Sequence, residues 1–95
     1  MPAHLVGEWV GDTKPARIKR IIFSADGNVT LQYTGGLVQR GPVVVEGSRM
    51  TFHIPGGPWQ EEAWSIQRLD DLYGYNFEYL MLDGSSYVRQ VGGNP

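Results

Sequence analysis

The chain has 95 residues, of which 41% are hydrophobic and 12% aromatic, and its formal net charge at pH 7 is −2. A chain of this length forms one domain, residues 1–95, around a single core. The acidic balance argues against nucleic acid as a partner, because phosphate binding normally requires a basic excess. Without cysteine, the chain can form neither disulfides nor thiolate metal sites.

The chain shows no sign of export or membrane insertion. Residues 1–4 lack the basic and apolar regions of a signal peptide, and no segment approaches the ~18 apolar residues of a membrane span. We therefore expect a cytoplasmic protein with no membrane partner.

Thirteen glycines and six prolines divide the chain into short segments rich in β-branched and aromatic residues. Such segments, separated by turns, are typical of β-sandwiches and β-barrels. In chain order, the predicted strands cover residues 5–10, 17–24, 29–34, 37–46, 50–54, 59–68, 72–82 and 85–90. Gly41-Pro42 predicts a bulge or bend in the fourth strand, and the tail from Val91 to Pro95 is expected to fray.

Tight turns make consecutive strands antiparallel neighbours, so the eight strands predict an all-β, up-and-down meander. Such a meander hides both edges by closing into a small barrel, in which the first and last strands meet. Alternation directs these side chains inward: Trp9, Ile21, Phe23, Leu31, Tyr33, Val43, Val45, Met50, Phe52, Trp64 and Ile66.

Five short motifs are spread along the chain: Gly7-x-Trp9, Ile21-x-Phe23-x-x-Asp26-Gly27, the hairpin from Gly41 to Gly47, Trp64-x-Ile66-x-x-Leu69 and Tyr87-x-Arg89. Together they resemble small lipocalin-like domains of the calycin group. The resemblance implies a barrel in which Gly7, Trp9 and Arg89 form the closed end, with Arg89 packed across the indole. Such a cation–π contact is worth ~0.5–2 kcal/mol. The chain departs from full-length lipocalins in lacking their length, their helix after the barrel, their disulfide and their long first loop.

The titratable residues show no catalytic pattern. His53 alternates with core positions and is expected to face solvent, while Asp70-Asp71 occupies a turn. Glu61-Glu62 places one carboxylate on each face of a strand. Two histidines without cysteine fall short of a metal site. We therefore expect no catalysis, no metal and no cofactor.

An eight-stranded barrel either fills with its own side chains or holds one small ligand. The ligand contacts we predict are Tyr33, Phe23, Phe52, Trp64 and Trp59. These residues favour non-enzymatic binding of a small hydrophobic or aromatic ligand. Trp59 follows the loop 55–58, where it either covers the barrel mouth or packs on its rim.

Residues 72–82 support an alternative function, a protein–protein interaction or self-association module with a filled barrel. Period two places five large side chains on one face: Tyr73, Tyr75, Phe77, Tyr79 and Met81. If this face points inward, it belongs to the core. If it points outward, it forms an apolar patch of a size that monomers rarely expose, and a homodimer through these aromatic residues would cover it. Alternation alone leaves both orientations open.

Overall fold

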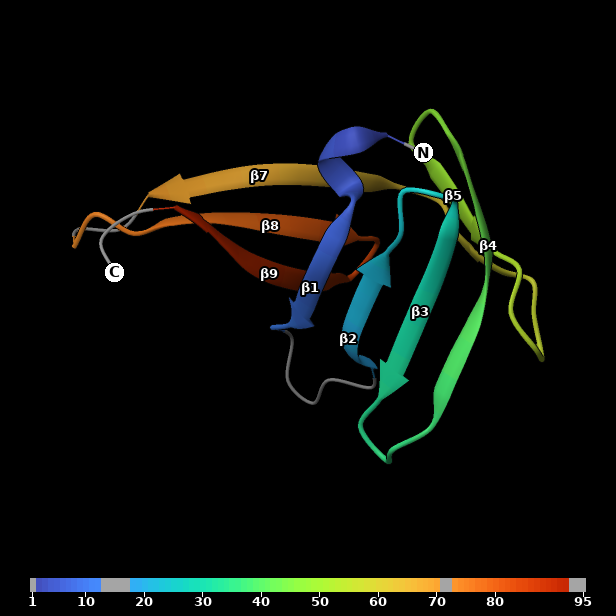
Figure 1. Cartoon of the computed structure of the whole chain (residues 1–95). Coiled ribbons are helices and arrows are strands. Elements are labelled where there is room, and N and C mark those ends of the chain that lie inside the picture. Colours follow the sequence, from blue (N-terminus) through green and yellow to red (C-terminus); the bar gives the residue numbers. More distant parts are fainter. Residues whose placement is uncertain (1, 13–17, 71–72, 93–95) are drawn as a thin grey trace.

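The structure is a computed structural model that describes residues 2–12, 18–70 and 73–92 (Figure 1). Within these residues, a short 3-10 turn, η1 (Ala3–Leu5), precedes nine strands: β1 (Gly7–Gly11), β2 (Ile18–Phe23), β3 (Asn28–Tyr33), β4 (Val38–Glu46), β5 (Arg49–Phe52), β6 (Trp59–Glu61), β7 (Trp64–Asp70), β8 (Asn76–Leu82) and β9 (Ser85–Gly92). They form one antiparallel sheet in the order β6-β5-β4-β3-β2-β1-β9-β8-β7.

The predicted all-β meander is confirmed, and its first and last strands do meet. Val10 pairs with Val88 and Gly11 with Tyr87, so β1 lies between β2 and β9. The two edge strands, β6 and β7, follow each other in the chain, but in the sheet each has only one neighbour. The sheet forms a curled half-barrel, and β7, β8 and β9 extend from it as an arm (Figure 1).

The prediction of a single strand over residues 59–68 is wrong. The segment breaks at Glu62 and Ala63, whose amides donate to the Asp83 carboxylate over 3.1 and 2.9 Å. These bonds turn the chain at the corner, so that β6 pairs with β5 and β7 with β8. The sheet therefore has nine strands, where the sequence predicts eight.

Other predicted boundaries also differ from the structure. The strand predicted from Leu5 begins at Gly7, because Leu5 belongs to η1. The strand predicted over residues 72–82 begins at Asn76, and residues 71–72 lie outside the described residues. Val91 and Gly92 belong to β9, although the tail from Val91 was expected to fray, and residues 93–95 also lie outside the described part.

β4 changes partner at the predicted bend. Residues 38–42 pair with β3 and residues 43–46 pair with β5, without a bulge in either ladder. At the crossing, the amide of His53 donates to the carbonyl of Pro42 over 2.8 Å. A Cβ atom on Gly41 would lie 1.9 Å from the carbonyl oxygen of His53. Only glycine therefore fits where the two ladders meet.

The core fills the concave face of the half-barrel. All eleven side chains predicted to point inward are either buried or packed against the buried cluster. The cluster contains further residues from η1 and from four of the strands: Leu5, Ile18, Val29, Leu80, Leu82 and Tyr87. The two leucines of β8 show which face of that strand is internal.

We predict that Gly41→Ala destabilises the protein by about 1–3 kcal/mol, the usual cost of overpacking, because the backbone of His53 must move. Urea unfolding measures the loss. Gly35→Ala is the matched control, since a Cβ atom there meets nothing within 4 Å. Equal midpoints for the two variants would contradict the close crossing at Gly41.

Candidate functional site

Arg89 and Trp9 pack together where β1 meets β9. The guanidinium carbon of Arg89 lies 4.0 Å from the centre of the Trp9 ring, and Trp9 is fully buried. Arg89 donates to the carbonyls of Val6 and His4 over 2.8 and 2.6 Å. The indole N–H of Trp9 donates to the carbonyl of Leu5 over 3.0 Å. The pair thus satisfies three carbonyls of the N-terminal turn.

Gly7 makes room for this pair. Its φ of +129° is rarely adopted by residues with a side chain, and a Cβ atom there would lie 3.0 Å from Nη1 of Arg89. In Gly7-x-Trp9, the glycine allows the positive φ and leaves room for Arg89, and the tryptophan two residues later provides the ring that Arg89 covers.

The carboxylate of Glu78 lies on the inner face of β8, where it pairs with Arg89. Its Oε1 accepts from Nε and Nη2 of Arg89 over 3.0 and 2.8 Å. Asn76 and Glu78 look unsuited to a core in the sequence. Pairing with Arg89 satisfies the Glu78 carboxylate, so this face can lie inside and the aromatic face of β8 lies outside.

We predict that Trp9→Ala lowers the free energy of unfolding by ~3–5 kcal/mol, since it removes a fully buried indole and the platform beneath Arg89. Guanidinium unfolding, followed by far-UV circular dichroism, provides the measurement. A loss below ~1 kcal/mol would be smaller than any buried tryptophan should give and would contradict this account of the pair of Trp9 and Arg89.

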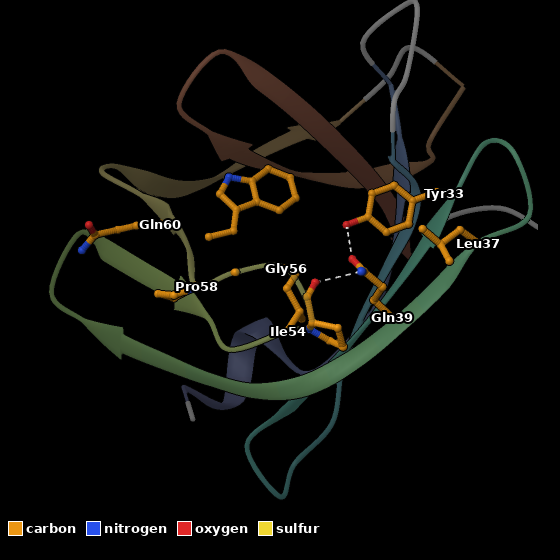
Figure 2. A pocket seen from close by; sticks show the side chains of 10 residues that line it. Tyr33, Leu37, Gln39, Ile54, Gly56, Pro58 and Gln60 are labelled. Atoms are coloured by element: carbon orange, nitrogen blue, oxygen red, sulfur yellow. Dashed lines mark hydrogen bonds between the residues drawn. The ribbon is translucent and has the colours of Figure 1, made fainter.

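A separate cleft of about 530 Å³ has neither Trp9 nor Arg89 in its lining (Figure 2). Its walls come from β3, β4, β6, the β3–β4 turn and the loop before β6: Tyr33, Leu37, Gln39, Ile54, residues 55–58, Trp59 and Gln60. None of these side chains carries a formal charge. The cleft is therefore an aromatic and aliphatic site with a few amide groups.

Gln39 organises one wall of the cleft. Its Oε1 accepts from the hydroxyl of Tyr33 over 2.7 Å, and its Nε2 donates to the carbonyl of Pro55 over 2.9 Å (Figure 2). The amide thus fixes both the Tyr33 ring and the start of the Pro55–Pro58 loop. Opposite them, Trp59 packs edge-on against Phe52, with ring centres 5.6 Å apart.

The five predicted ligand contacts are divided by the structure. Tyr33 and Trp59 line the cleft, and Trp59 also packs against the core. Phe23 and Phe52 are buried beneath and touch each other, with ring centres 6.4 Å apart. Trp64 lies elsewhere, where its indole donates to the carbonyl of Gly47 over 2.7 Å.

Sequence reasoning did not select Gln39, Leu37 or Ile54 for the site. Ile54 shares the alternation of Met50 and Phe52, which is the signal that could have found it. Gln39 is opposite Leu31 in the β3–β4 ladder, and only this register shows that its amide points inward.

Glu61 is a buried carboxyl group that the sequence interpretation set aside. It is 8% exposed and lies two residues after Trp59 on β6. Burial, followed by the hydrogen bond and charge of Asp83, raises the pKa of Glu61 from 4.5 to about 7. The same hydrogen bond, aided by the Glu62 amide, lowers the pKa of Asp83. The raised pKa of Glu61 favours its protonated form, and the lowered pKa of Asp83 favours the carboxylate that accepts the amides of the β6–β7 corner.

Tyr87 stands near this pair. Burial, then the charge of Glu61 and the proximity of Tyr33, raises the pKa of Tyr87 to about 12, so its hydroxyl stays neutral. Glu61 and Tyr87 are therefore both uncharged at mildly acidic pH.

We predict that Glu61 makes stability fall as the pH rises. Its folded pKa, about 7, exceeds the unfolded value, 4.5, so its contribution is complete below pH 4.5 and is lost as the pH passes 7. Wild type should lose on the order of 1–2 kcal/mol between about pH 5 and 8 relative to Glu61→Gln, after allowance for solvent screening. The lowered pKa of Asp83 changes stability only below its ordinary pKa of 3.8, which is outside this pH range.

Urea unfolding of both proteins at several pH values tests this dependence. Glu61→Gln keeps a hydrogen-bond donor and similar volume, so only the titration is removed. Parallel pH profiles for the two proteins would contradict a raised pKa of Glu61 in the folded protein.

Within the parts of the chain that the structure describes, no three His, Asp or Glu side chains lie close enough to hold a metal ion together. Among the same residues, no helix is long and apolar enough to cross a membrane.

Comparison with protein-family models, with curated proteins and with solved structures finds no match to this chain.

Proposed function

We propose that this protein binds a small, uncharged, largely apolar ligand with a flat ring, without catalysis and without a cofactor. The observation that carries the proposal is the cleft of about 530 Å³ between Tyr33 and Trp59, whose lining has no charged side chain. Clefts of roughly 300–1,000 Å³ with apolar and aromatic walls suit molecules of this kind.

The polar groups of the cleft favour an uncharged ligand. Both ends of the Gln39 amide are already engaged, with Tyr33 and with Pro55. A charged ligand would lose its hydration without gaining an ion pair, which is costly. A flat apolar ring instead displaces water from Trp59 and Ile54. Such a ring makes few hydrogen bonds with water, so the cleft does not need to replace them.

The depth of the cleft limits where the ligand sits. Phe23 and Phe52 are buried and in contact, so the interior below Trp59 is filled with side chains. The ligand therefore occupies the mouth of the half-barrel, above Phe52, with Trp59 as one wall.

The proposal includes a lipocalin-like, calycin-type architecture and a cytoplasmic location. The cluster of Gly7, Trp9 and Arg89 and the separate cleft support the comparison with a ligand-binding barrel. In this interpretation, the gap between β6 and β7 is the place where a full barrel would close.

A matched pair of surface substitutions tests the function. Leu37 lines the cleft and Val38, its neighbour, does not, although their exposed fractions are similar, 58% and 54%. We predict that Leu37→Asp weakens binding of the uncharged fluorescent probe N-phenyl-1-naphthylamine about tenfold or more, because a carboxylate beside an apolar ligand must be desolvated. Val38→Asp should bind within about twofold of wild type.

Fluorescence titration of the probe gives the three dissociation constants. Failure of wild type to bind the probe, or equal losses in both variants, would contradict the proposed cleft. Native mass spectrometry of protein purified without added ligand complements the titration, since a retained small molecule would reveal the chemical class of the natural ligand.

A further inference from the structure

The arm formed by β7, β8 and β9 has two unlike faces. Even-numbered residues of β8, such as Leu80, point into the core, so its odd-numbered residues point out. The ladder places Leu69 beside Phe77, and Tyr79 beside Val88. We call the resulting surface the outer aromatic face, and it comprises Leu69, Phe77, Tyr79, Met81 and Val88.

The charged side chains of the arm lie on its inner face. Across the described side chains of β7, β8 and β9, every charged group lies on the inner side: Arg68, Asp70, Glu78 and Arg89. Two ion pairs bind these groups to one another, Arg68 with Asp70 at 3.2 Å and Arg89 with Glu78 at 2.8 Å. The outer aromatic face carries only apolar, hydroxyl and amide groups.

No second layer covers this face within the described residues. Every extensive contact of β7, β8 and β9 is made with a neighbouring strand of the same sheet. Leu69 is 53% exposed, and Tyr73, just before β8, is 78% exposed. In Figure 1 the arm extends away from β2 to β5, so its far half stands clear of the half-barrel.

We infer that the outer aromatic face binds a second copy of this chain, through face-to-face packing of the two arms about a two-fold axis. A two-fold interface brings each patch against itself, so like charges on it would repel. This face has none, whereas the adjacent surface of β1 and β2 carries Glu8 and Arg20, which pair at 2.6 Å. Tyrosine, phenylalanine and methionine are also the residues enriched at protein interfaces.

The area of the outer aromatic face determines the affinity that we expect for the dimer. Three strands of about seven residues cover roughly 20 by 15 Å. Val10 of β1, opposite Val88 and 41% exposed, extends the apolar surface by one strand. Two such faces bury on the order of 1,000 Å², at the low end of specific interfaces, so we expect a dissociation constant in the micromolar range.

Sedimentation velocity over about 1–200 µM protein tests the dimer, and we expect the dimer fraction of wild type to rise across this range. Leu69→Lys places a charge in the face at an exposed position, so the fold should be kept and the dissociation constant should rise at least tenfold. Val44→Lys is the matched control, because Val44 is 41% exposed on the outer face of β4 and should leave dimerisation within about twofold of wild type.

Tyr75→Ser combined with Phe77→Ser provides a second test. These rings are 6.4 Å apart, and their removal should abolish the dimer with an unchanged circular dichroism spectrum. A wild type that stays monomeric throughout, or a dimer that persists in Leu69→Lys, for example through the edge of β7, would overturn the inference. Probe binding in the cleft reports on a different surface, so failure of one proposal does not imply failure of the other.

Discussion

The contact between Arg89 and Trp9 is the constraint on which the rest of the structure depends. One guanidinium lies over the indole, donates to the carbonyls of Val6 and His4, and binds the carboxylate of Glu78. A planar cation with several fixed donors can make these contacts at once, which a lysine ammonium cannot. It thereby joins the N-terminal turn, β1, β8 and β9, and it determines which face of the arm is internal.

That choice of internal face divides the surfaces of the molecule by chemistry. Glu78 pairs with Arg89 on the inner face of the sheet, so the aromatic residues of β8 point outward. The inner face of the arm therefore carries the charged side chains, and its outer face carries none among the described residues. Elsewhere, Gln39 uses its amide to hold Tyr33 and Pro55, so the cleft also presents an uncharged surface. The two candidate binding surfaces are thus separate, and each avoids the cost of desolvating a charge.

The local sequence pattern was sufficient to predict the meander, the alternation of core residues and the meeting of the first and last strands. Turn residues and the alternation of side chains along a strand depend only on residues close together in sequence. The contact of Trp9 with Arg89 came from the resemblance to lipocalin-like domains. The break at Glu62 was not predictable in this way, because it depends on Asp83, which is 21 positions away. Residues 72–82 alternate equally well in either orientation, and only the partner of Glu78 decides between them. The burial of Glu61 likewise depends on its distant hydrogen-bond partner.

The central place of β1 also has a consequence for how the chain acquires its structure. β1 is bordered by β2 on one side and by β9 on the other, and the bond from Arg89 to Val6 spans 83 positions. Contacts between residues so far apart in sequence make folding slow, because a large loop must close before they form. During synthesis, Trp9 emerges before β9 and has no cation to cover it until Arg89 leaves the ribosome. The environment of the buried indole is therefore completed only after Arg89 has been made.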